Sequence, residues 1–416
     1  MIKNFTLILL AFIATNLLLT AQVEQVSVNP SYTHQAYYNL ATGEVTQVPN
    51  DAWDIAFSND GVQDAGVFIN ESASLDGNSV KAYLSLEADW ATAITDVSVF
   101  SDTTTILYNA EQNWIEGAFN SMRIPNSPFD YGWGEYNPPT NSVVGNKIFV
   151  IQKRDGSFIK FQILQLIDGE YSFRYADLDG SNEATAIASK NDAGENPLIY
   201  FSFDSGETVD MPTDYDLVFQ RYTTDVDDGT GTFIPYNVTG VLLSPGAEAV
   251  IADGVDPASV SESDYTGEYT TTPIVIGHHW KIFDFTAGWM IDEDRAQFVK
   301  TKNGDIYKIV FFDFEGSLTG ITTLEKTKVV LSSTQLTASD VGITVYPNPT
   351  ADFVYISGNK DYYNAMIYDA KGQLVLNEKI DLGKAQLNLN ELNSGLYTLV
   401  LRNEDTVVNH RLIKTD

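Results

Sequence analysis

The chain has 416 residues, with 56 acidic against 24 basic side chains and a formal net charge of −32. A charge of this size and sign repels phosphate backbones and anionic membrane surfaces, which argues against nucleic acid as a partner. Hydrophobic residues make up 44% of the chain and aromatic residues 12%, enough for more than one sizeable core. Because the chain contains no cysteine, disulfides and a lipid-bearing cysteine are both excluded.

The first 21 residues have the pattern of a cleavable signal peptide. Lys3 precedes an apolar run from residue 7 to residue 19, and a small residue, Ala21, follows. The run is too short to span a bilayer as a helix. We therefore expect it to be removed on export, and we expect no transmembrane segment in the mature chain.

Two stretches, residues 37–57 and 200–219, share a pattern of strand, turn and strand. In both, aromatic and aliphatic residues alternate with polar ones, which predicts strands with one buried face. A Gly-Glu pair supplies the tight turn in each. Trp53-Asp54 in the first stretch corresponds to Tyr215-Asp216 in the second. The two aspartates lie on the face opposite the aromatic residues, so we expect them to be solvated.

A second pair of matching stretches, residues 149–164 and 298–312, predicts one β-hairpin in each half of the chain. An Asp-Gly pair lies between alternating β-formers in the first stretch, and an Asn-Gly pair lies at the matching place in the second. These dipeptides are the strongest short signal for a hairpin turn.

A tryptophan precedes each hairpin by nearly the same interval: Trp133 in GWGEYN and Trp280 in HWKIFDF. The strand-turn-strand stretch, the tryptophan and the hairpin occur in the same order in both halves of the chain, which indicates a duplication. The stretch 181–196 is small and polar and lacks β-alternation, so it marks the boundary between the copies. This boundary places the first copy at residues 22–190 and the second at residues 191–332.

The stretch 126–141, NSPFDYGWGEYNPPTN, is rich in Pro, Gly, Asn and aromatic residues. This composition is typical of an ordered loop rather than of regular structure. Its aromatic side chains either stack on a planar ligand or a sugar ring, or pin the loop to the core.

These landmarks resemble the HmuY family of secreted heme-binding proteins, in two copies over residues 31–331. The resemblance rests on four features. The first is the aromatic strand and Gly-Glu turn that begin each copy, here called the head; the others are the Trp-Asp strand, the GW-x-E-aromatic segment and the Lys-bearing hairpin. It implies all-β domains that hold heme at the bacterial surface between two axial side chains, histidines in the founding member and methionines in some relatives. One axial histidine of the founding member lies five residues after the tryptophan. This chain has Pro138 and Phe285 there, and neither side chain ligates iron.

Other histidines and methionines are then the candidate heme ligands, because neutral imidazole and thioether sulfur both bind heme iron. His278 and His279 come first, since they adjoin Trp280, and Met290 follows in the same segment. His34 lies just ahead of the first head. Heme is thus the cofactor that the resemblance implies, held here by non-standard axial ligands.

Two acidic loops, DLDGSNE and DVDDG, are candidate Ca²⁺ sites. Carboxylates stand at alternate positions next to a glycine, so several oxygens could converge on one cation. Neither loop completes the twelve-residue calcium-loop pattern, and acidic turns are common in acidic proteins. The candidate ligands are Asp177, Asp179 and Glu183 in the first loop and Asp225, Asp227 and Asp228 in the second.

After a polar linker at residues 333–342, residues 343–416 form another unit. Its markers are YPNP at its start, the alternating run QLNLNEL, the turn and strand NSGLYTLVL, and a basic end. This set closely resembles the C-terminal sorting domain of proteins exported by type IX secretion. The resemblance implies a small β-sandwich that the type IX machinery reads, on a chain that is secreted or attached to the outer-membrane surface.

Nothing in the chain matches GxSxG, HExxH, a P-loop or a dinucleotide glycine fingerprint. We therefore expect an all-β binding protein rather than an enzyme, with two tandem HmuY-like domains and a small C-terminal β-sandwich. Its expected partners are the type IX machinery and a small planar ligand or a surface polymer. A non-heme binding or adhesion module on the same fold is the alternative, and a hydrolase built on a carboxylate pair is a remote one.

Overall fold

The computed structural model describes residues 21–59, 61, 64–329, 336–337, 342–358, 362–369, 371, 373–382, 385–402 and 407–415. The signal peptide predicted at residues 1–21 lies almost wholly outside this range. The described residues form strands and short 3-10 turns, which confirms the all-β fold class. The chain divides into two compact units, residues 1–329 and 330–416.

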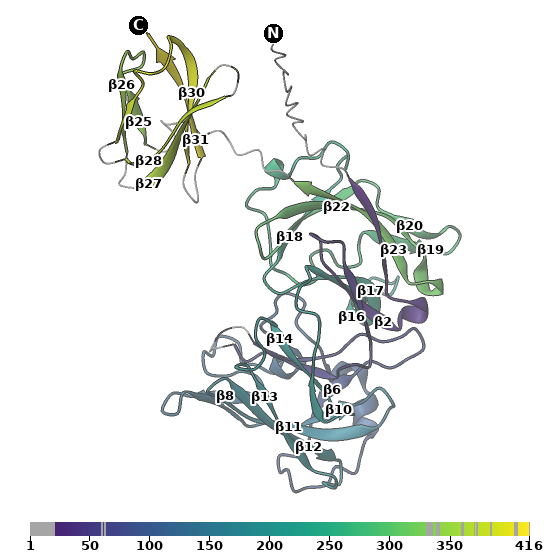
Figure 1. The fold of residues 1–416 in the computed structure, drawn as a ribbon. Helices are drawn as coiled ribbons and strands as arrows, with labels where there is room; N and C mark the ends of the chain where they lie inside the picture. Colours follow the sequence, from purple (N-terminus) through teal and green to yellow (C-terminus); the bar gives the residue numbers. More distant parts are fainter. Residues whose placement is uncertain are drawn as a thin grey trace, which may run out of the picture. The chain divides into compact units, whose positions relative to one another are not determined.

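Two antiparallel sheets in the N-terminal unit each combine strands of both predicted copies, and we call them the shared sheets. One has the order β15 (Glu207–Val209), β14 (Leu198–Ser202), β4 (Ile55–Ser58) and β5 (Val67–Ile69). The other has the order β17 (Phe233–Leu243), β16 (Leu217–Asp227), β2 (His34–Tyr38) and β3 (Val45–Pro49). Figure 1 shows β2, in purple, beside the teal β16. The first hairpin of each copy therefore pairs with the Trp-Asp or Tyr-Asp strand of the other.

Each shared sheet packs on a larger sheet, and we call each such pair of sheets a lobe. The sheet of β15, β14, β4 and β5 belongs to the first lobe, and the sheet of β17, β16, β2 and β3 belongs to the second. The first lobe contains an eight-stranded sheet of β6 (Lys81–Leu84), β7 (Ile106–Leu107), β8 (Gly134–Asn137), β9 (Ser142–Gly145), β10 (Phe149–Gln152), β11 (Phe158–Ile167), β12 (Glu170–Asp177) and β13 (Ala184–Ser189). The second lobe contains a five-stranded sheet of β1 (Gln22–Ser27), β18 (Glu248–Asp253), β21 (Arg295–Lys300), β22 (Ile306–Phe314) and β23 (Ile321–Val329), together with the hairpin β19 (Lys281–Asp284) and β20 (Gly288–Ile291).

Short 3-10 helices interrupt the connections between strands. They are η1 (Pro30–Tyr32), η2 (Ser98–Ser101), η3 (Thr103–Thr105), η4 (Ala118–Asn120), η5 (Glu262–Asp264) and η6 (Gly316–Leu318). None exceeds four residues, so in the described part of the chain packing is between sheets.

The exchange decides which residues share a core. Phe201, from the head of the second copy, packs in the first-lobe core with Phe57 and Trp133. Tyr38, from the head of the first copy, packs in the second-lobe core with Trp280. The lobes therefore differ from the sequence copies 22–190 and 191–332, because each lobe takes its first hairpin from the other copy.

The structure places both predicted hairpin turns where the dipeptides stand. Gly156 and Gly304 adopt φ of 86° between β10 and β11 and between β21 and β22. The stretch 181–196, interpreted as a boundary because it lacks β-alternation, contains β13, which pairs with β12 along its length. Its small residues still alternate between an inner and an outer face, and pairing with β12 satisfies its backbone groups.

The expectation that Asp54 and Asp216 are solvated is wrong. Their exposed fractions are only 7% and 5%. Each carboxylate accepts a hydrogen bond from a backbone amide of the exchanged hairpin, that of Phe203 and that of Leu40 respectively. Strand alternation does turn the aspartates away from the aromatic face, but the exchanged hairpin covers that second face too.

The C-terminal unit is a small β-sandwich. Its five-stranded sheet contains β24 (Leu336–Thr337), β31 (Val407–Lys414), β30 (Gly395–Arg402), β27 (Tyr362–Tyr368) and β28 (Leu374–Asp381). Its three-stranded sheet contains β25 (Thr344–Tyr346), β26 (Phe353–Ser357) and β29 (Ala385–Asn388). Leu387, Leu399 and Leu412 are fully buried in one shared core, as the sorting-domain resemblance implied.

Candidate functional site

A pocket of about 670 Å³ opens beside the β8–β9 hairpin of the first lobe. The rings of Phe129 and Tyr136 lie at its wall, nearly parallel, with 6.2 Å between centroids and 4° between planes. The Tyr136 hydroxyl donates to Asn141 Oδ1 at 2.7 Å, which fixes that ring. Half of the Phe129 surface is exposed. The pocket wall thus carries two nearly parallel aromatic rings, and solvent reaches at least that of Phe129.

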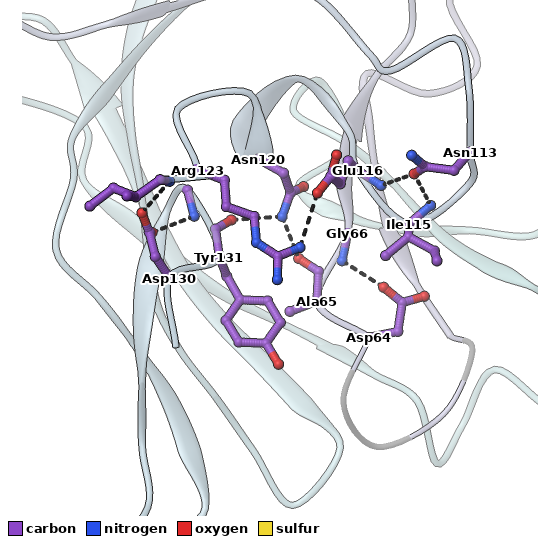
Figure 2. Close-up of polar contacts among 12 residues, drawn as sticks. Asp64, Ala65, Gly66, Asn113, Ile115, Glu116, Asn120, Arg123, Asp130 and Tyr131 are labelled. Carbon is purple, nitrogen blue, oxygen red and sulfur yellow. Dashed lines mark hydrogen bonds and ion pairs between the residues drawn. The ribbon is translucent and has the colours of Figure 1, made fainter. Parts of the chain in front are cut away.

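The loop leading into this hairpin is held by several polar contacts (Figure 2). The Asn120 side chain donates to the carbonyls of Ala65 and Tyr131, at 3.1 and 2.8 Å. Arg123 forms a 2.9 Å ion pair with Glu116 and lies over the Tyr131 ring. These contacts pre-organise the pocket wall, so a ligand would meet a fixed surface and not a loose loop.

Asp130 turns the chain back toward β8. Its carboxylate accepts hydrogen bonds from the amides of Ile124 and Gly132, at 2.7 and 2.8 Å. Trp133 follows and is fully buried, with Nε1 donating to the carbonyl of Ala65 at 2.9 Å. The tryptophan landmark of the sequence therefore anchors the hairpin to the core.

The β19–β20 hairpin occupies the corresponding place in the second lobe. Trp280 beneath it is buried and stacks on Phe311 with 4.0 Å between ring centroids. Phe285, at the hairpin tip, is 98% exposed, and its ring contacts Phe283, which contacts Trp289. This hairpin presents an aromatic strip to solvent.

The structure brings His278 and His279 into contact, but not as an axial pair. Their ring centroids lie 4.1 Å apart, so no porphyrin plane fits between them. His278 Nδ1 lies 3.3 Å from the Tyr222 hydroxyl. Burial lowers the pKa of His278 to about 4 and also lowers that of His279, so both rings are neutral at neutral pH.

The two other candidate heme ligands lie elsewhere. Met290 is 43% exposed and pairs with Ile282 across the β19–β20 hairpin. His34 begins β2, contacts Thr33 Oγ1 at 3.0 Å and lines a separate pocket beside Arg154. Because the rings of His278 and His279 contact each other, at most one of these two histidines can serve as an axial ligand of any one heme.

Two segments of the chain match known protein families. Residues 31–175 match the family described as HmuY protein. Residues 344–415 match the family described as secretion system C-terminal sorting domain. The chain contains an HmuY domain and a type IX C-terminal sorting domain. The second predicted copy, residues 191–332, lies outside the matched range and stays a prediction.

Other comparisons are distant. No curated protein matches the chain. Among solved structures, apo PinO from Porphyromonas gingivitis is 12% identical, covers 75% of this chain and 99% of its own, and has a TM-score of 0.23. Dimeric latent PorU from Porphyromonas gingivalis is 10% identical, covers 94% of this chain and 34% of its own, and has a TM-score of 0.15. Neither likeness supports a conclusion about this chain.

The first-lobe pocket lies largely within the HmuY domain. Pro138, which stands where the founding member has a histidine, is next to β8 at the turn of the hairpin that walls the pocket. The described residues that line the pocket include no histidine or methionine. Burial raises the pKa of Tyr131, opposed by Arg123, so its hydroxyl stays neutral. This part of the HmuY domain is therefore suited to stacking on a plane more than to ligating iron.

The carboxylates of the candidate calcium loops are not gathered into one cluster, and calcium binding there stays a prediction. Among the described residues, no three His, Asp or Glu side chains lie close enough to hold a metal ion. The carboxylates close their own turns instead: Asp177 accepts from Asn182 at 2.7 Å, and Asp228 accepts from the Thr230 amide at 2.8 Å.

No helix in the described part of the chain is long and apolar enough to cross a membrane.

A second cavity, of about 70 Å³, lies where the two shared sheets meet. We call it the junction cavity. Two edge-to-face pairs from matched positions line it: Tyr37 with Tyr215 at 4.8 Å and Trp53 with Tyr200 at 4.9 Å. Glu71 also lines it and is 8% exposed. The sequence gives no motif that marks Glu71, and only the tertiary structure shows it buried.

Proposed function

We propose that the protein is an exported binding protein of the bacterial surface whose HmuY domain binds a planar porphyrin-type ligand, heme included, in the first-lobe pocket. Export and surface location rest on the sorting domain at residues 344–415. The observation that carries the ligand class is the near-parallel pair Phe129 and Tyr136 at the wall of a 670 Å³ pocket. Pockets for small molecules and cofactors typically measure about 300–1,000 Å³.

Stacking takes the place of histidine ligation in this proposal. An aromatic plane of the ligand gains dispersion and area burial against Phe129 and Tyr136, and this gain does not depend on a metal. Bound heme would supply its iron and its colour, while the chain's residues hold the plane. The proposal is therefore of a porphyrin-binding protein with non-standard ligation and no catalytic step.

Two parallel titrations of the mature chain, residues 22–416, test the proposal. One uses hemin and the other uses iron-free protoporphyrin IX, each followed by absorption and by tryptophan quenching. We expect saturable binding of both, and we expect Phe129→Ala and Tyr136→Ala to weaken both at least tenfold. His278→Ala is the matched control in the second lobe and should leave both unchanged.

Two results would contradict the proposal. Binding of hemin alone, with a Soret band that shifts on His278→Ala, His279→Ala, His34→Ala or Met290→Ala, would move the heme to the histidine and methionine ligands. If the spectra of hemin and of protoporphyrin IX stay those of the free compounds when the protein is added, the protein binds neither, and the proposal is wrong.

The aromatic strip of β19–β20 favours a second candidate function, recognition of a surface polymer. Phe285, Phe283 and Trp289 form a row of solvent-reached rings on a two-stranded support. Rings in such a row can stack on sugar faces, and exposed apolar strips of this kind mark binding surfaces. Retention of the protein on insoluble polysaccharide, lost in Phe285→Ser and kept in Phe129→Ala, would support this function.

A further inference from the structure

The junction cavity combines two features that no role described above uses. Its wall is aromatic, and it contains a buried carboxylate. The residues that define it are Trp53, Glu71, Trp114, Tyr200, Tyr215 and Tyr222, drawn from both predicted copies. The cavity exists only because the exchanged hairpins bring these residues to one place.

Glu71 is held in position by two backbone amides, but no counter-charge in the described part of the chain pairs with it. Its Oε1 accepts from the Asn109 amide at 3.0 Å, and its Oε2 accepts from the Thr223 amide at 3.2 Å. No lysine, arginine or histidine of the described residues forms an ion pair with it. Burying a carboxylate without a counter-charge is costly, so the site favours a cation.

The surroundings add negative charge and no positive charge. Glu111 also lines the cavity, and its charge helps to raise the pKa of Glu71, although burial is the larger cause. Tyr108 faces the same carboxylate. His278, which contacts Tyr222 at the cavity wall, is neutral at neutral pH because burial lowers its pKa. An anionic ligand is therefore excluded by charge.

We propose that the junction cavity binds a small organic cation, with an alkylammonium or methylated ammonium head inside. Aromatic faces attract such heads through their quadrupoles, and desolvated sites strengthen the attraction. Glu71 supplies the counter-charge at the cavity wall. A volume of about 70 Å³ is roughly half that of the apolar cavity known to hold benzene, so only a small head group enters.

A hydrated metal ion fits the cavity less well. A divalent ion needs several converging oxygens, and the described residues gather no three acidic or histidine side chains around one point. The carboxylate and the rings together match an organic cation, for which one counter-charge and apolar contact suffice.

Calorimetric titration of the mature chain with choline chloride tests the proposal. 3,3-Dimethylbutan-1-ol, which has the shape of choline without its charge, is the matched control. We expect saturable choline binding, at least tenfold weaker binding of the neutral alcohol, and at least tenfold weaker choline binding in Glu71→Gln. Because the cation prefers the ionised carboxylate, affinity should fall as the pH drops below about 7.

The neutral alcohol keeps the test independent of the variant's folding. Equal binding of choline and the alcohol to the wild type, or no binding of choline, methylammonium or tetramethylammonium at millimolar concentration, would overturn the proposal. A folded Glu71→Gln protein that binds choline as the wild type does would overturn it too. Phe129→Ala should leave choline binding unchanged, so this site and the porphyrin pocket succeed or fail separately.

Discussion

The Asp54 carboxylate accepts a 2.8 Å hydrogen bond from the amide of Phe203, 149 residues further along the chain. Asp216 makes the equivalent 2.8 Å bond with the amide of Leu40. Each bond joins the head hairpin of one predicted copy to the strand of the other. The two equivalent bonds therefore fasten both exchanged hairpins to the strands beside which they lie.

Removing either carboxylate should weaken the exchange. We expect Asp54→Ala and Asp216→Ala each to lower the free energy of unfolding by about 1–3 kcal/mol, because a buried amide loses its acceptor. Asn at either position keeps an acceptor oxygen and should cost less. Urea unfolding of the mature chain measures both. Ala and Asn variants that both match the wild type would show that the two bonds add nothing.

The exchange also predicts how the chain can be divided. A fragment of residues 22–190 lacks β14, which pairs with β4 and supplies Phe201 to the first-lobe core. We expect this fragment to be digested rapidly by protease and to bind a hydrophobic dye, because apolar surface stays exposed. Residues 22–329 should resist protease. A stable, dye-free 22–190 fragment would mean that each sequence copy folds alone.

Lys281 should give the second lobe a stability that rises with pH. Its ammonium nitrogen lies 4.4 Å from the Trp280 ring centroid and donates to the carbonyl of Thr239, and burial lowers its pKa to about 7. Above pH 7 the unfolded chain therefore binds more protons than the folded chain does. The stability of the wild type should rise relative to Lys281→Met by up to about 1.4 kcal/mol per pH unit between pH 7 and 9. Guanidinium unfolding at both pH values measures the difference, and parallel slopes would refute it.

Lys160 and Lys308 stand at matching places in the two predicted hairpins but differ in burial. Lys160 is 1% exposed and donates to the Trp90 carbonyl at 2.7 Å, whereas Lys308 is half-buried and donates to the Pro257 carbonyl at 2.6 Å. We expect Lys160→Met to cost about 1.5–3 kcal/mol and Lys308→Met clearly less, since a charge-assisted bond counts for more away from water. Thermal unfolding of the two variants, compared with the wild type, provides the measurement. Equal losses would show that burial does not set the difference.

The sequence by itself determined the local structure and the type of fold. Alternation of apolar residues predicted the strands, and the Asp-Gly and Asn-Gly pairs predicted the turns at Gly156 and Gly304, because only the local backbone is involved. The two families that match the chain were already visible in landmarks such as Trp133 and the YPNP segment. The composition of the stretch 126–141 indicates an ordered loop whose aromatic residues either contact a ligand or pin the loop to the core, and the buried Trp133 does the latter.

Only the tertiary structure decided what covers the second face of each strand. Alternation shows that Asp54 lies opposite the aromatic residues, but it does not show that a hairpin from 149 residues away covers that face. The same limit hid Glu71, whose burial depends on residues from both copies meeting at one cavity. Local pattern records the period of a strand, whereas the choice of pairing partner depends on the packing of the whole chain.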